Sequence, residues 1–137
     1  MFLPLFLRRK KISPKHLLRD LHYLILHSQL FRWTTMGSLF CVSLVWILPI
    51  WRIIPLTEQQ PYLPLHYNIY FGIDQFGPWY QVFFLPILGT ILLLVNTCFE
   101  AVFFQKERII STFFALGTVI AEGILFVSML FIVLLNI

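Results

Sequence analysis

The sequence predicts an all-α integral membrane protein with three transmembrane helices. Of its 137 residues, 59% are hydrophobic and only 12% are charged, whereas an ordinary soluble domain carries about 25% charged residues. The apolar residues gather in three stretches that each approach the roughly 20 residues needed to cross a bilayer. Backbone groups in lipid must be bonded within their own segment, so we expect these stretches to be helices. The composition excludes a typical soluble domain and a disordered chain.

The expected spans cover residues 33–51, 79–104 and 109–136. Together they define a membrane domain over 33–137, with a loop over 52–78 between the first two spans. Pro49 is expected to bend or end the first helix because proline lacks a backbone N–H. Pro86 is expected to kink the second helix for the same reason.

The distribution of lysine and arginine predicts the orientation of the chain. Seven of these residues precede the first span and two lie between the second and third spans, whereas the loop over 52–78 carries only Arg52. Cytoplasmic segments carry the excess of basic residues. The sequence therefore predicts a multi-pass protein of the bacterial inner membrane, with the N-terminus inside and both the loop and the C-terminus outside.

Residues 1–32 form a basic cytoplasmic segment with a predicted amphipathic helix. Ser13 can cap this helix, Pro14 suits its first position, and apolar residues recur at helical spacing up to Phe31. Its basic start suits anionic lipid head groups, although a soluble helix packed against the spans is the alternative. Nucleic acid is not an expected partner, because basic flanks belong to any protein with a cytoplasmic N-terminus. The basic residues expected at the membrane surface are Arg8, Arg9, Lys10, Lys11, Lys15 and Arg19.

The loop over 52–78 is the most informative part of the sequence. Pro55, Pro61 and Pro64 make it stiff. Apolar and polar residues alternate over 65–71, which indicates an extended segment lying on an apolar surface. Glycines around Asp74 predict turns. Its aromatic residues suit a membrane interface. The candidate site residues of this loop are Pro64, His66, Tyr67, Asn68, Gly72 and Asp74.

The order of these residues resembles the signature of an uncharacterised bacterial membrane-domain family. In that family the first span leads into an outer loop that reads Pro-x-His-aromatic-Asn, followed by Gly and Asp. Here the run over 64–68 reads PLHYN, and Gly72 lies one position later than in the family. The family includes the immunity proteins of the sporulation-delay toxin system, which carry a further membrane region. The resemblance covers the loop and the start of the second span, and it implies an outer loop between two spans.

Three interpretations of this motif stay open. His66, Asn68 and Asp74 could bond the loop backbone and fix its turns, which is the commonest use of such residues. They could instead contact a ligand or peptide. A metal or catalytic site is the weakest interpretation, because a third strong ligand and a nucleophile–base pair are both missing from the pattern. We therefore predict no enzyme activity, no cofactor and no bound metal.

Three of the polar residues within the predicted spans are candidate site residues: Glu122, Thr90 and Asn96. A carboxylate at mid-membrane costs about 2.5–3.5 kcal/mol on insertion scales, so Glu122 is expected to face protein or to carry a proton. The simpler interpretation is a hydrogen bond between helices. The alternative is a proton relay or a ligand contact.

These observations predict a small non-enzymatic membrane protein with an accessory, sensing or immunity-like role, acting through its aromatic outer loop. The alternative is a small transporter or proton-coupled membrane subunit centred on Glu122. Three spans bury little surface against one another, so the expected partners, besides the lipid bilayer, are further copies of the chain or another membrane protein.

Overall fold

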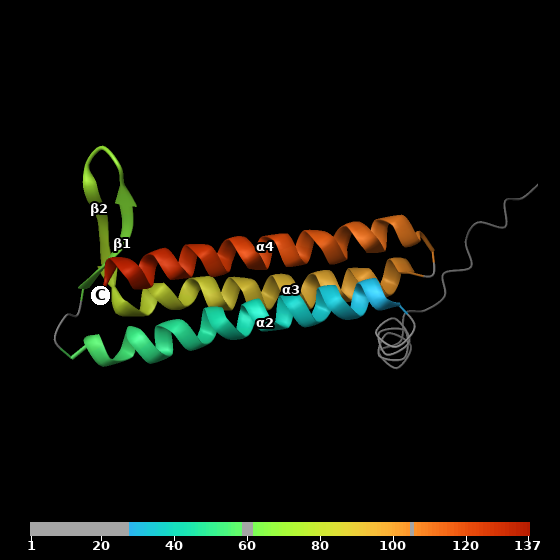
Figure 1. The fold of residues 1–137 in the computed structure, drawn as a ribbon, viewed down its shortest axis with the longest axis horizontal. Coiled ribbons are helices and arrows are strands. Elements are labelled where there is room, and N and C mark those ends of the chain that lie inside the picture. The colour runs from blue at the N-terminus through green and yellow to red at the C-terminus, as the bar shows by residue number, and fades with distance from the viewer. Residues whose placement is uncertain (1–27, 59–61, 105) are drawn as a thin grey trace, which may run out of the picture.

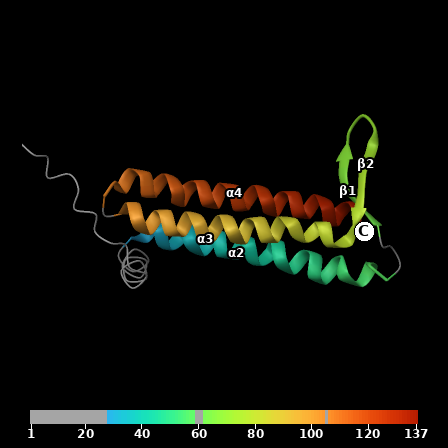
Figure 2. The same ribbon diagram turned by 180° about the vertical axis from the view of Figure 1, so that it is seen from behind.

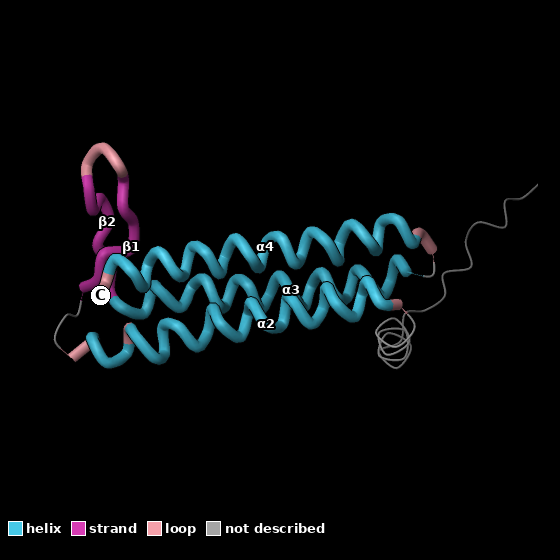
Figure 3. Tube along the Cα trace, viewed as in Figure 1, coloured by secondary structure: helices cyan, strands magenta, loops and turns pink. Residues whose placement is uncertain are grey.

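The structure is a computed structural model that describes residues 28–58, 62–104 and 106–137. Three helices, α2 (Gln29–Arg52), α3 (Phe84–Phe104) and α4 (Arg108–Leu135), lie side by side along most of their length (Figures 1 and 3). Each helix, with its short 3-10 extension where it has one, is long and apolar enough to cross a membrane. The N-terminal basic residues from Arg8 to Arg19, and most of the amphipathic helix predicted there, lie outside the described residues. The last residues of that predicted helix, 29–31, belong to α2, which begins before the expected start of the first span at residue 33.

The helices pack through stripes of buried residues at alternating spacings of three and four. This spacing places one stripe on a single helix face, as in left-handed bundles. Many members of the stripes are small or polar, which lets helix backbones approach closely in a membrane. On α4 the buried residues are Ser111, Ala115, Thr118, Glu122, Met129 and Val133. On α2 they are Phe31, Ser38, Val42, Val45 and Pro49.

The two prolines lie at opposite ends of their helices. Pro49 lies inside α2, which continues to Arg52 before a single 3-10 turn, η1 (Ile54–Leu56). Pro86 lies in the first turn of α3, directly after the 3-10 helix η2 (Trp79–Phe83). A proline is tolerated in a first turn because its missing N–H would have no helical acceptor there. The sequence predicted a kink at Pro86, and the structure changes from 3-10 helix to α-helix just before this residue.

The expectation of an all-α fold is wrong in one respect, because the chain also forms a small sheet. Strands β1 (Tyr62–Asn68) and β2 (Gly72–Pro78) pair in antiparallel order as a hairpin. The predicted extended segment over 65–71 therefore begins earlier and ends at Asn68. Its partner strand reads GIDQFGP, whose glycines and aspartate have low strand propensity, so the sequence indicated turns there.

The hairpin stands at one end of the bundle, together with the C-terminus. Figures 1 and 2 show that it leaves the bundle sideways, across the direction of the helices, at the level where α4 ends. The connection between α3 and α4 lies at the opposite end. A cluster of buried apolar residues fills the hairpin end of the bundle; it contains Val45, Ile53, Leu63, Val82, Met129 and Val133.

Candidate functional site

The hairpin is anchored to the bundle by its base. The side chain of Leu63 is fully buried in the apolar cluster at the hairpin end. The side-chain amide of Asn136, just beyond the end of α4, donates a hydrogen bond of 2.9 Å to the backbone carbonyl of Pro64. Gly77, opposite Leu63 in the sheet, is also buried, and a Cβ there would collide with the side chain of Gln81. These contacts hold the base of the hairpin against all three helices or their ends.

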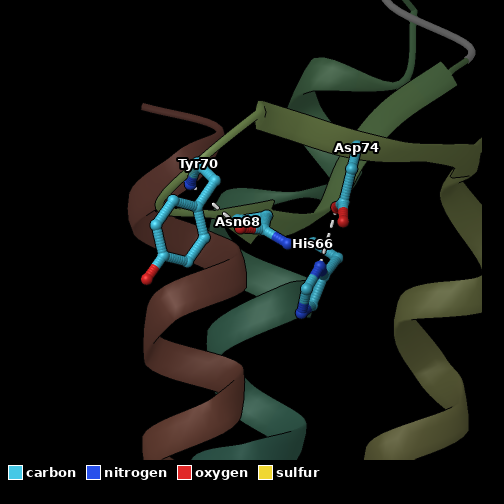
Figure 4. A network of polar contacts seen from close by, with 4 residues as sticks. All are labelled: His66, Asn68, Tyr70 and Asp74. Atoms are coloured by element: carbon cyan, nitrogen blue, oxygen red, sulfur yellow. Dashed lines mark hydrogen bonds and ion pairs between the residues drawn. The ribbon is translucent and has the colours of Figure 1, made fainter.

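The stem of the hairpin carries a polar pair from the predicted motif. His66 Nδ1 and Asp74 Oδ1 are 2.7 Å apart across the two strands (Figure 4). The strand register is irregular on both sides of His66, and such bulges re-aim side chains. With a proton on Nδ1, the ring donates a hydrogen bond to the carboxylate. The pair therefore joins the two strands at the irregular position.

The turn of the hairpin is built by two other motif residues. The side-chain oxygen of Asn68 accepts a hydrogen bond of 2.9 Å from the backbone N–H of Tyr70, which is an Asx turn. Gly72 follows with φ of +75°, a conformation that side chains other than glycine rarely adopt. Asn68 thus bonds the backbone of the turn, as the first of the three interpretations expects, whereas His66 and Asp74 bond each other.

The tip of the hairpin, defined as residues 69–71, presents large side chains to the surroundings. Ile69, Tyr70 and Phe71 are 82%, 86% and 83% exposed. The ring of Tyr70 points away from the polar pair in Figure 4. Further along the stem, Tyr67 and Phe76 are also exposed. Exposed apolar groups gathered on one element are typical of a binding surface.

The hairpin presents two kinds of surface group, a polar pair and large apolar or aromatic side chains. His66 and Asp74 lie together at the surface, and a hydrogen-bonded pair of this kind needs a third group to form a metal site. Across the described ranges, no group of three or more His, Cys, Asp or Glu side chains is placed to hold a metal ion. The main chemical feature of the hairpin is its exposed aromatic surface.

Replacing Asp74 with alanine is expected to lower the free energy of unfolding by no more than about 1 kcal/mol, because an exposed ion pair contributes little. The His66 and Asp74 side chains are 60% and 36% exposed. Denaturant titration in detergent would measure the difference. Asp74→Asn, which retains an oxygen acceptor, is the matched control and should behave as wild type. A loss of several kcal/mol in the alanine variant would show that the pair is structurally essential.

Two of the three predicted intramembrane polar residues bond between helices. The side-chain amide of Asn96 on α3 donates to the hydroxyl of Thr118 on α4 at 3.0 Å. The indole N–H of Trp46 on α2 donates to the hydroxyl of Thr90 on α3, also at 3.0 Å. Such bonds between helices contribute about 0.6–2 kcal/mol each in a membrane. The interpretation of Asn96 as an interhelical bond is confirmed.

Glu122 differs from these residues. Its side chain is fully buried in the bundle, and neither carboxyl oxygen has a hydrogen-bond partner among the described residues. It faces Gly89 of α3, since a Cβ added there would lie 2.9 Å from Glu122 Oε2. The hydrogen bond between helices that was the simpler interpretation of Glu122 is therefore not found among the described residues. The carboxyl group lies beside Gly89 and takes no part in the hydrogen bonds of Asn96 and Thr90.

Sequence reasoning missed the residues that anchor the hairpin. Leu63 carries the main apolar contact, and Asn136 provides the polar contact from the far end of the chain. Leu63 lies between Tyr62 and Pro64, and only its strand register shows that it points toward the bundle. Asn136 was an available signal, because it is the single polar residue at the end of the third apolar stretch.

Comparison with known proteins adds no relative: no protein-family model matches the chain, and neither a curated protein nor a solved structure matches it.

Proposed function

We propose that this chain is a non-enzymatic membrane protein that acts through its hairpin, in an accessory, sensing or immunity-like role. One observation carries the proposal: the hairpin base is buried in the bundle, while the tip side chains are more than four-fifths exposed. An isolated two-stranded hairpin is marginally stable in water. Anchoring it in the bundle keeps the aromatic surface ordered before a partner arrives, which lowers the entropy lost on binding.

The motif resemblance supports the part of this proposal that places an outer loop between two spans. Its residues build the features that shape the hairpin: Asn68 and Gly72 make the turn, and His66 and Asp74 join the strands. Two candidate partners of the hairpin at the membrane surface are another membrane protein and a membrane-active peptide. Further copies of the chain are a third candidate, because the three spans leave large apolar faces exposed.

Photocrosslinking tests the proposal directly. A benzophenone amino acid in place of Phe76, an exposed side chain on the stem, should form a specific protein adduct in native membranes. The same group in place of Ile120, an exposed residue on α4, is the matched control within the predicted span. Tyr67→Ala should abolish the Phe76 adduct without changing the amount of protein. Equal adduct yields at positions 76 and 120 would contradict recognition through the hairpin. So would a Phe76 adduct whose yield is unchanged in the Tyr67→Ala variant.

The proposed orientation places the hairpin outside the bacterial inner membrane, with the connection between α3 and α4 in the cytoplasm. In a variant without Cys41 and Cys98, cysteine at Gln75 should react with an impermeant maleimide in intact cells. Cysteine at Lys106, also exposed, should react only after permeabilisation, because basic segments stay inside. The reverse pattern would invert the topology.

A second candidate function is favoured by Glu122. Its carboxyl is fully buried and has no hydrogen-bond partner in the described part of the chain. Such a group is costly in a membrane, and residues of this kind commonly serve ion or proton pathways. On this alternative the chain is a small transporter or proton-coupled subunit. The Glu122 variants described in the Discussion separate the two functions.

A further inference from the structure

The hairpin tip has an unusual composition for a turn. Turns are normally built from Gly, Pro, Asn, Asp and Ser, which tolerate water and special backbone angles. Here three large apolar or aromatic residues follow one another at the tip, and all are more than 80% exposed. Their backbone is already satisfied in part by Asn68. These side chains would therefore be more stable in an apolar environment outside the protein than in water.

The direction of the hairpin brings its tip beside the bundle, where the lipid around transmembrane helices would lie. It leaves the bundle across the helix direction, beside the last turns of α4, instead of continuing along the bundle axis (Figures 1 and 2). The bond from Asn136 to the carbonyl of Pro64 fixes the hairpin base at the level of the α4 end. If the helices cross a bilayer, a surface at this level and in this direction coincides with the membrane interface.

Charge and neighbouring aromatic residues agree with that level. Residues 67–73 contain no charged side chain, whereas Asp74 and its partner His66 stand further back on the stem. Two further aromatic residues are largely exposed near the same end of the bundle. They are Trp51, at the end of α2, and Tyr80, in η2. Tryptophan and tyrosine gather at the level of the lipid head groups.

We propose that the tip, residues 69–71, inserts into the interface of the leaflet on the hairpin side, so that the lipid bilayer itself is its ligand. This inference rests on the proposed function, which places the hairpin beside a bilayer. Tyrosine and phenylalanine suit this site because one end of the hairpin meets head groups while the rings meet acyl chains. The stem then lies flat on the membrane, with its exposed residues available to a partner at the surface.

Depth measurements in vesicles test the insertion. The full chain, with Cys41 and Cys98 replaced by alanine, is reconstituted into phosphatidylcholine vesicles with an environment-sensitive nitrobenzoxadiazole label on Tyr70→Cys. The matched control carries the label on Gln75→Cys, an exposed position on the stem. We expect iodide in the buffer to quench the label at 70 several-fold less than the label at 75. Lipids with a spin label near the head group should quench the label at 70 more strongly than the label at 75.

A charged tip gives the second arm of the experiment. Ile69→Asp and Phe71→Asp change exposed side chains, so the bundle should fold normally, and the label at 70 should become as accessible to iodide as the label at 75. Equal access at both positions in the unaltered tip would overturn the inference. So would protection of position 70 in native membranes but not in pure lipid, because that result assigns the tip to a protein. The vesicles contain no partner, so a failure here leaves the crosslinking test of the proposed function intact.

Discussion

Replacing Leu63 with alanine is expected to release the hairpin from the bundle. Leu63 is fully buried at the hairpin end, among residues from α2, η2 and α4 and their connections. Truncating a buried leucine to alanine costs about 2–5 kcal/mol, from the lost transfer free energy and the cavity left behind. Much of this cost should appear as local opening, because the three helices also hold one another through separate contacts.

Two measurements check this prediction. Denaturant titration in detergent should show the loss of stability, and hydrogen exchange should show faster exchange of the strand amides in β1 and β2 than in the helices. Ile69→Ala is the matched control, since Ile69 lies on the same hairpin but is 82% exposed. Similar effects of both variants would contradict the view that Leu63 is the anchor. The Leu63 variant should also lose the crosslink at Phe76.

Replacing Glu122 with methionine is expected to stabilise the bundle. The buried carboxyl has no protein hydrogen-bond partner among the described residues, and leaving a buried polar group unsatisfied costs about 1–3 kcal/mol. Methionine is unbranched and similar in length, so it can fill the space beside Gly89 without that cost. The free energy of unfolding in detergent should rise by a similar amount. Glu122→Gln retains a polar group and should stay close to wild type in stability.

The same variants decide between the two candidate functions. If the protein acts through its hairpin, both Glu122→Gln and Glu122→Met should retain partner crosslinking and cellular function. If the protein is proton-coupled, Glu122→Gln should assemble normally and lose a pH-dependent activity, because glutamine cannot bind and release a proton. A stable but inactive glutamine variant would therefore favour the transport function. A destabilised methionine variant would show that the carboxyl has a structural partner after all.

The polar contacts inside the helix bundle were only partly predictable from the sequence. The interpretation of the polar residues in the spans as hydrogen bonds between helices was correct for Asn96, which bonds Thr118. It failed for Glu122, because hydrogen bonding depends on where each side chain ends, and a match in depth along two helices does not set the distance across them. Gly89 lies beside Glu122 and lets the carboxyl fit, yet glycine offers no side chain to bond it.

By itself the sequence determined the three apolar helices, the ordered segment between the first two, and the turn at Asn68 and Gly72. These features follow from local properties: composition, span length and the conformations that single residues prefer. Only the tertiary structure decided that the segment is a hairpin, since β2 has weak strand propensity and forms by pairing with β1. It also decided that Leu63 and Asn136 anchor this hairpin, because their contacts join residues far apart in the chain. The sideways direction of the exposed tip follows from those contacts, and a periodic pattern along one segment carries no information about them.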